Sequence, residues 1–315
     1  MRQTCLNMIH ALAKKDERVV FIGSDPGAGT LDAMRREMPD RFFIEGVSEA
    51  NVIGMAAGLA MEGYIPYVNT IATFLTRRCY DQIAVDLCLH KLPVRLVAAG
   101  GGLVYAPLGP THQAIEDIAI MRALPNMTVL AASDANQMTD VMPQTLDWPG
   151  PIYIRLGKGG DAVVPLDQPI TLGKASKLRE GRDVLFVTTG IMLQQCVAAA
   201  DALADSGISA GILFFPTVKP FDAAALVSAG RGVPLVAAVE EHTDIGGLGA
   251  AVAEILLENS CAPSAGLLRI GIPDRFATKY GSQDQLLAHF GIDADGIVRR
   301  VCERIGVAQI KKKIA

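Results

Sequence analysis

The chain has 315 residues, of which 50% are hydrophobic and 20% are charged, so it is long enough to form the cores of two ordinary domains. Its formal net charge of −4 at pH 7 argues against a protein that binds nucleic acid or a membrane surface. No apolar run approaches the roughly 18 residues that a membrane-spanning helix needs. The six cysteines are scattered without a CxxC pair or zinc-type spacing, so we expect buried, reduced thiols in a cytoplasmic protein.

The first half of the chain alternates short apolar runs with segments of helical periodicity. After a helical segment at 5–13, the continuous apolar run at 19–22 is typical of a strand that is buried on both faces of a sheet. Further strands are expected at 42–44, 65–68, 94–98, 128–131 and 152–156. This alternation predicts a doubly wound α/β domain, to which we assign residues 1–165.

A second alternating series follows a segment with little periodicity. Pro169 and Gly173 interrupt this segment, and we interpret residues 166–182 as a linker. Strands are expected after it at 184–188, 210–214, 235–239 and 267–270, and helices near 193–205, 223–229, 247–258 and 294–305. Residues 183–315 are therefore predicted to form a second doubly wound α/β domain.

Glu49 is the first candidate for chemistry, because ligands of open α/β sheets bind beyond the carboxyl ends of the strands. A predicted strand ends at Ile44, the backbone turns at Gly46, and Ser48 is expected to cap the helix that follows. Glu49 is thereby left at the mouth of this helix. The alternative is that its charge merely complements the helix N-terminus.

His112 is the strongest candidate among the histidines. It stands directly before a predicted helix, where it could transfer a proton or bind a hydroxyl group; the alternative is a histidine that only caps this helix. The glycine run 100–102 is not followed by a helix start, so we interpret it as a mobile loop over a site. The glycine-rich turn 23–30 lacks the GxGxxG spacing of a phosphate-binding turn and is interpreted as a plain loop.

Two arginines stand near the ends of predicted strands. Arg77 lies in the turn after the strand at 65–68, and Arg155 lies at the end of the strand at 152–156. An arginine at such a position can hold a phosphate or carboxylate with two hydrogen bonds. The equally open alternative is a surface pair for Arg77 and its neighbour Arg78, and a satisfied ion pair at the strand end for Arg155. The sequence contains no catalytic triad signature and no cluster of metal ligands.

Three blocks together resemble the transketolase family of thiamine diphosphate enzymes. Residues 41–60, 73–83 and 109–117 are similar to the family's catalytic glutamate block, its cofactor-stacking block and its substrate-binding histidine loop. Their order and spacing imply a pyrimidine-binding domain followed by the family's C-terminal domain. The resemblance covers the whole chain, which makes it more specific than any single motif.

The resemblance also implies a role for each candidate residue. Glu49 would share a proton with a ring nitrogen of thiamine diphosphate, and Phe74 would stack on the aminopyrimidine ring of the cofactor, unless it only packs in the core. His112 would bind or protonate substrate oxygens. Arg155 would hold the phosphate of a sugar phosphate, with Arg77 as a weaker candidate beside the cofactor.

The resemblance further implies a partner chain. The sequence contains no Gly-Asp-Gly followed by an Asn pair, which is the family's site for Mg²⁺ and diphosphate. We therefore expect an N-terminal, diphosphate-binding subunit that carries most of the Mg²⁺ contacts, in an α2β2 assembly. The loop at 100–105 also lacks the His or Arg that full-length transketolases or deoxyxylulose phosphate synthases carry near there.

The activity that this resemblance implies is the transfer of a two-carbon ketol unit between sugar phosphates. Two enzymatic alternatives remain open: the beta subunit of a 2-oxoacid dehydrogenase, and an enzyme similar to deoxyxylulose phosphate synthase. A non-catalytic assembly subunit is a third reading. The joint presence of Glu49, Phe74 and His112 argues against it, because a chain without catalytic demands has little reason to keep all three.

Overall fold

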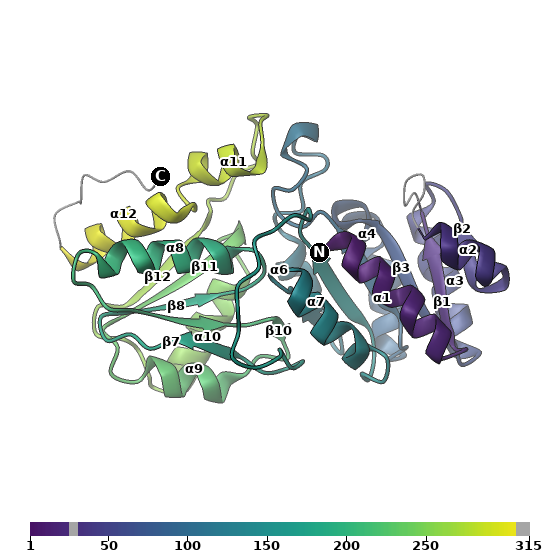
Figure 1. Cartoon of the computed structure of the whole chain (residues 1–315), viewed down its shortest axis with the longest axis horizontal. Coiled ribbons are helices and arrows are strands. Elements are labelled where there is room, and N and C mark those ends of the chain that lie inside the picture. Colours follow the sequence, from purple (N-terminus) through teal and green to yellow (C-terminus); the bar gives the residue numbers. More distant parts are fainter. Residues whose placement is uncertain (25–30, 307–315) are drawn as a thin grey trace.

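The computed structural model describes residues 1–24 and 31–306, so residues 25–30 of the glycine-rich turn lie outside the described part. Two sheets lie side by side along the long axis of the molecule (Figure 1). The first has seven strands in the order β10-β5-β6-β4-β3-β1-β2, and the second has five in the order β12-β11-β8-β9-β7. All pairings are parallel except that β10 is antiparallel to β5 and β7 is antiparallel to β9.

The first sheet is built mainly from the N-terminal half of the chain. Its strands are β1 (Val19–Gly23), β2 (Phe42–Ile44), β3 (Ile65–Ile71), β4 (Arg95–Ala99), β5 (Thr128–Leu130), β6 (Ile152–Leu156) and the later β10 (Thr217–Lys219). Its helices are α1 (Arg2–Lys15), α2 (Asp32–Glu37), α3 (Glu49–Met61), α4 (Ala72–Arg78), α5 (Tyr80–Gln82), α6 (Asp117–Ala123) and α7 (Ala135–Val141). Short 3₁₀ turns occur at Pro39–Arg41, Ala106–Leu108 and Met142–Thr145, and a π-helical segment occurs at Ile83–Leu89.

The second sheet belongs to the C-terminal half. Its strands are β7 (Ser176–Arg179), β8 (Val184–Thr188), β9 (Ala210–Phe214), β11 (Leu235–Thr243) and β12 (Leu267–Ile272). Its helices are α8 (Met192–Ala204), α9 (Ala223–Gly230), α10 (Leu248–Glu258), α11 (Gln283–Phe290) and α12 (Ala294–Ile305). Figure 1 shows α8 and α12 on one face of this sheet and α9 and α10 on the other.

Both faces of each sheet are covered, which explains why the strands read as continuous apolar runs. Successive side chains of a strand point to opposite faces. In β1, Phe21 joins the core beneath α1 and α7, whereas Ile22 joins the core beneath α3 and α4. In β8, Phe186 and Val187 divide between two faces in the same way. The expectation of two α/β domains with mainly parallel sheets is confirmed.

Every strand expected from the sequence is present, but β7, β10 and α11 were not expected, and the segment around Arg77 that was interpreted as a turn is the helix α4. β7 lies inside the range 166–182 that was interpreted as a linker, and β10 leaves the second half of the chain to join the first sheet. All six cysteines are free thiols, and Cys261 is only half-buried. Within the described residues, no helix is long and apolar enough to cross a membrane.

A buried cluster of charges joins the two halves of the molecule. In β6, Arg155 Nε donates to Asp117 Oδ2 at 2.8 Å, and the hydroxyl of Tyr153 donates to the same oxygen at 2.7 Å. Arg155 Nη2 donates to the carbonyl oxygen of Glu241 at 2.9 Å, which ties β6 to the end of β11 in the second half. Asp117 is fully buried, so the arginine neutralises a charge that has no access to water.

The carboxylate of Glu241 extends this cluster to the glycine run. Glu241 Oε1 accepts hydrogen bonds from the backbone N–H of Leu103 at 2.9 Å and from Gln283 Nε2 at 2.7 Å. Arg155 Nη1 lies 3.9 Å from Glu241 Oε2. Burial raises the pKa of Glu241 to about 7, and this effect outweighs the lowering by Arg155 and by the two hydrogen bonds.

The raised pKa of Glu241 predicts how stability depends on pH. An acid whose pKa is about 7 in the folded protein and 4.5 otherwise opposes folding as pH rises between those values, because only the unfolded chain has then lost the proton. Glu241→Gln removes this titration. We expect the free energy of unfolding, measured by denaturant unfolding, to fall between pH 5 and pH 7.5. This fall should be larger in the wild type than in Glu241→Gln, by on the order of 3 kcal/mol.

A matched control for this comparison is Glu258→Gln, which changes an exposed glutamate at the end of α10. Its pH dependence should follow that of the wild type. Equal slopes for Glu241→Gln and the wild type would show that Glu241 does not bear the proton in this range.

Candidate active site

Glu49 is the first residue of α3 and lies beyond the carboxyl end of β2. Its side chain is 4% exposed, and the hydroxyl of Ser24 donates to Glu49 Oε1 at 3.3 Å. The expected side-chain cap by Ser48 is wrong, because the Ser48 hydroxyl donates instead to the carbonyl oxygen of Glu45. Glu49 is therefore a nearly buried carboxylate at a helix start, where backbone N–H groups favour negative charge.

Arg78 and Phe74 complete the surroundings of this carboxylate. Both residues belong to α4, which follows β3 at the same edge of the sheet, and they are one helical turn apart. Arg78 Nη1 donates to Glu49 Oε2 at 3.0 Å. The same guanidinium lies over the ring of Phe74, with Cζ 4.1 Å from the ring centroid. A planar cation is thus held between an aromatic face and a carboxylate.

The ring of His112 also packs against that of Phe74. The two ring centroids are 5.1 Å apart, and the planes meet at 65°, an edge-to-face arrangement. Thr111 Oγ1 lies 2.9 Å from His112 Nδ1, so a hydroxyl that donates here leaves the proton of a neutral imidazole on Nε2. The structure therefore brings Glu49, Phe74 and His112 together, with Arg78 between the first two.

The two candidate arginines differ in how they are held. Arg77 pairs with Glu116 through Nε and Nη2, and Nη2 also donates to the carbonyl oxygen of Gln113 at 3.0 Å. This ion pair is about one-third exposed and lies beside the histidine loop. Arg155 is 6% exposed, and its Nε and Nη2 are already engaged by Asp117 and by backbone carbonyl oxygens. Its guanidinium therefore serves the buried cluster between the domains.

The glycine run is held in place, which contradicts the expectation of a mobile loop. Gly102 exchanges two backbone hydrogen bonds with Ala114, at 2.8 and 3.0 Å. The backbone N–H of the next residue, Leu103, donates to Glu241 Oε1. A Cβ at Gly102 would lie 2.3 Å from Glu241 Oε2, and one at Gly101 would lie 2.5 Å from Arg155 Cγ. Glycines here allow close contact with the buried cluster rather than movement.

Sequence reasoning gave Gln113 no role in this site, and it weighed Arg78 only as a pair with Arg77. Both amide atoms of Gln113 are buried without a hydrogen-bond partner in the described part of the chain, as is the hydroxyl of Thr73. Buried polar groups of this kind are normally paired, so these atoms mark hydrogen bonds that the described residues leave unmade. The adjacent Arg77 and Arg78 gave no sequence signal to tell which one points at Glu49.

The geometry fits the aminopyrimidine of thiamine diphosphate. Such a ring needs an aromatic face to stack on and a carboxylate near a ring nitrogen, which Phe74 and Glu49 could supply. Both residues already contact a planar group, the guanidinium of Arg78. Among residues 1–24 and 31–306, no group of three or more His, Cys, Asp or Glu side chains could hold a metal ion.

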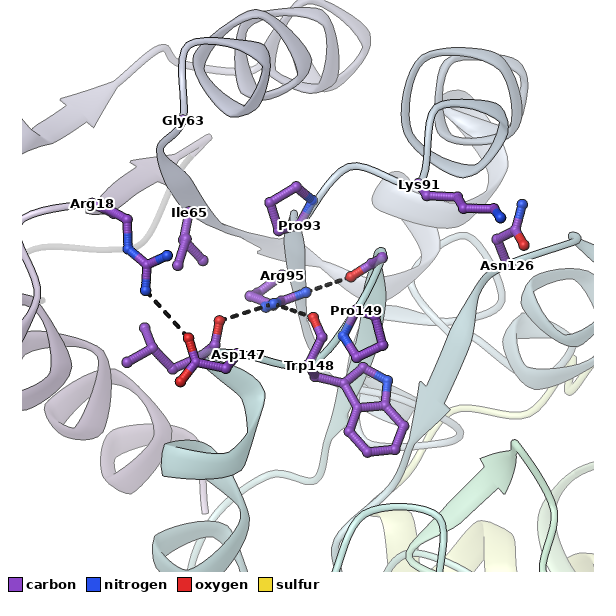
Figure 2. Close-up of a pocket in the computed structure, with 12 residues that line it drawn as sticks. Arg18, Gly63, Ile65, Lys91, Pro93, Arg95, Asn126, Asp147, Trp148 and Pro149 are labelled. Atoms are coloured by element: carbon purple, nitrogen blue, oxygen red, sulfur yellow. Dashed lines mark hydrogen bonds and ion pairs between the residues drawn. The ribbon is translucent and has the colours of Figure 1, made fainter.

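A groove of about 570 Å³ lies at the opposite edge of the first sheet, where β3 and β4 begin (Figure 2). Its central residue is Arg95, which is fully buried and donates to the carbonyl oxygens of Leu146, Trp148 and Gly150. These bonds tie down the loop before β6. Because ligands of open α/β sheets bind at the carboxyl ends of the strands, we assign the site to the edge that bears Glu49.

Comparison with known proteins identifies the family of the chain. Residues 1–160 match the family model "Transketolase, pyrimidine binding domain", and residues 173–297 match "Transketolase, C-terminal domain". The chain is 39% identical over 305 residues to the 6-deoxy-6-sulfo-D-fructose transketolase subunit SqwH of Clostridium sp. (strain MSTE9), covering 96% of this chain and 94% of the relative. It is 38% identical over 290 residues to 1-deoxy-D-xylulose-5-phosphate synthase 1 of Geobacter sulfurreducens, covering 91% of this chain but only 45% of that protein.

A solved structure is also similar to almost the whole chain. It is described as "Split gene transketolase, inactive beta4 tetramer" and superposes with a TM-score of 0.86 at 34% identity, covering 98% of both chains. The two matched domains follow one another in the order of the two sheets described above. The chain therefore belongs to the transketolase family, with a pyrimidine-binding domain followed by a transketolase C-terminal domain.

Proposed function

We propose that this chain is the C-terminal, beta-type subunit of a split transketolase that moves a two-carbon ketol unit between sugar phosphates. The observation that carries the proposal is the cluster of Glu49, Phe74 and His112 at the carboxyl edge of the first sheet. Relatives that match nearly end to end and bear the names of separate transketolase subunits support a split enzyme.

The cofactor in this proposal is thiamine diphosphate, which supplies a nucleophilic carbon that takes up the two-carbon unit. Glu49 would share a proton with a ring nitrogen of the bound aminopyrimidine, since Arg78 reaches both this carboxylate and the ring of Phe74 on which the aminopyrimidine would stack. Phe74 supports the face of that ring. His112, at the edge of Phe74, binds or protonates oxygens on the substrate carbons between which the bond is cleaved or formed.

A partner subunit completes the proposed enzyme by binding the diphosphate group and Mg²⁺. Ile44 and Val47 are 46% and 72% exposed at the end of β2 and in the turn after it, which leaves apolar surface on the segment that leads to Glu49. The similar solved structure reported above is described as an inactive beta4 tetramer, which supports the need for a second kind of subunit. We propose an α2β2 assembly in the cytoplasm.

Arg77 and Arg155 remain the two residues proposed to bind phosphate. Arg77 is the better placed, because its guanidinium is partly exposed and its partner Glu116 lies next to the histidine loop. Arg155 is 6% exposed, and its Nε and Nη2 already bind Asp117, which is fully buried, so a phosphate would compete with this pair. Leaving such a carboxylate unpaired is strongly unfavourable.

Glu49→Gln tests the proposed proton transfer. The amide keeps the shape of the carboxyl but cannot share a proton with the cofactor, so we expect kcat of the reconstituted complex to fall about 100-fold or more at saturating cofactor. The measurement is steady-state transfer from a ketose phosphate to an aldose phosphate. Glu45→Gln, an exposed glutamate on the same turn, is the matched control. Undiminished turnover by Glu49→Gln would contradict the role of Glu49.

Arg77→Met and Arg155→Met separate phosphate binding from structural support. Arg77→Met should raise KM for the sugar phosphate several-fold without a large loss of stability, because its ion pair is partly exposed. Arg155→Met should instead lower the free energy of unfolding by about 3 to 5 kcal/mol. Kinetics and chemical denaturation of both variants check this. If Arg155→Lys raised KM while stability was unchanged, the phosphate site would belong to Arg155.

A second candidate function is synthesis of a deoxyxylulose phosphate, favoured by the 38% identity to a 1-deoxy-D-xylulose-5-phosphate synthase. The beta subunit of a 2-oxoacid dehydrogenase and a non-catalytic assembly subunit are the remaining alternatives. Substrate profiling of the complex distinguishes them, because only a transketolase uses a ketose phosphate as donor without a 2-oxoacid. Acyl transfer to a lipoyl carrier without sugar phosphate activity would contradict the proposal.

A further inference from the structure

Arg78 occupies the position at which the proposed function requires the aminopyrimidine of the cofactor. It is the last residue of α4, and its side chain turns back over Phe74, which lies one helical turn earlier. The guanidinium carbon is 4.1 Å from the ring centroid, which is a contact distance. Nη1 donates to Glu49 Oε2 at 3.0 Å, so one side chain engages both residues assigned to the ring.

The chemistry of the two groups is alike. A guanidinium is planar and delocalised, carries a positive charge and points N–H donors outward in its plane. An aminopyrimidine that is protonated at a ring nitrogen has the same features. Both therefore favour stacking on an aromatic face with an N–H directed at a carboxylate. One face of Phe74 at contact distance accepts one such group, so the two occupants exclude each other.

We propose that Arg78 is a resident placeholder for the aminopyrimidine: it neutralises Glu49 in the free chain and must leave Phe74 and Glu49 before the cofactor can bind. This inference rests on the proposed function, since it takes thiamine diphosphate as the incoming group. Cofactor binding is then an exchange of one planar cation for another.

The surroundings of Arg78 allow such an exchange. About half of its side chain is exposed, whereas Glu49 is 4% exposed, so the arginine can swing into solvent while the carboxylate stays in place. The neighbouring Arg77 does not compete for this position, because Glu116 and the carbonyl oxygen of Gln113 hold it elsewhere. Leaving the site requires Arg78 to break one ion pair and one ring contact.

The exchange reduces the apparent affinity for the cofactor. When a binding-competent state is only fractionally populated, the apparent Kd rises by the inverse of that fraction. A partly exposed ion pair together with a cation–π contact corresponds to an effect of about tenfold on an equilibrium constant. Removing Arg78 should therefore tighten cofactor binding, although it removes a side chain from the site.

The test is the apparent Kd for thiamine diphosphate of the complex with the partner subunit, measured by isothermal titration calorimetry. We expect Arg78→Met to bind about tenfold more tightly than the wild type. Arg78→Lys keeps the charge but lacks the planar stack, so its Kd should fall between the two. Arg179→Met is the matched control: Arg179 also pairs with an acid, Asp201, and is 37% exposed, but it lies in β7. Its Kd should equal that of the wild type.

Weaker or unchanged binding by Arg78→Met would overturn the placeholder, because it would mean that Arg78 helps to hold the cofactor or does not meet it. Failure of the proposed function gives a different result, since the wild-type complex would then bind no thiamine diphosphate at all. Thermal unfolding of the variants shows whether they are folded. Half of Arg78 is exposed, but its removal leaves the nearly buried Glu49 unpaired, so Arg78→Met should melt several degrees below the wild type.

Discussion

The buried ion pair between Arg155 and Asp117 is the interaction on which the rest of the site depends. Its two partners come from β6 and from the start of α6, and Arg155 Nη2 also donates to the carbonyl oxygen of Glu241 in β11 of the second domain. Two buried charges are tolerated only when their hydrogen bonds are satisfied, which fixes the elements that provide the partners. Through Glu241 the same cluster binds Leu103, the residue after the glycine run. One network therefore holds the glycine run, the start of α6 and the contact between the domains.

Apart from Glu49, the residues that would contact the cofactor are more exposed than the buried ion pair. Phe74 and Arg78 lie on a short helix, and His112 lies on a loop that ends at α6, where Asp117 anchors it. This division has a physical reason, because a group that must bind and release ligands cannot itself be locked into a buried ion pair. It also explains why two arginines near strand ends have different roles: Arg155 supports the structure, whereas Arg78 faces the ligand position.

The sequence predicted the strands well because a parallel sheet covered on both faces imposes long apolar runs, such as the one around Phe21 and Ile22. It could not predict β10, because three residues at a sheet edge carry almost no pattern and their partner, β5, is distant in the chain. Glu49 and His112 were singled out by their positions at the starts of predicted helices, and Phe74 through the resemblance between spaced blocks. Arg78 was not told apart from Arg77, because the choice between adjacent arginines depends on which side of a helical turn each one faces.

The central claim is that this chain supplies one half of a transketolase active site. The most direct measurement is transfer of an isotopically labelled two-carbon unit from a ketose phosphate to an aldose phosphate, with thiamine diphosphate and Mg²⁺ present. The reaction is run with this chain alone, with a subunit that carries the diphosphate-binding domain alone, and with both together. The account predicts labelled product only in the mixture. Transfer by this chain alone, or no transfer by a mixture that forms a stable complex and binds the cofactor, would contradict it.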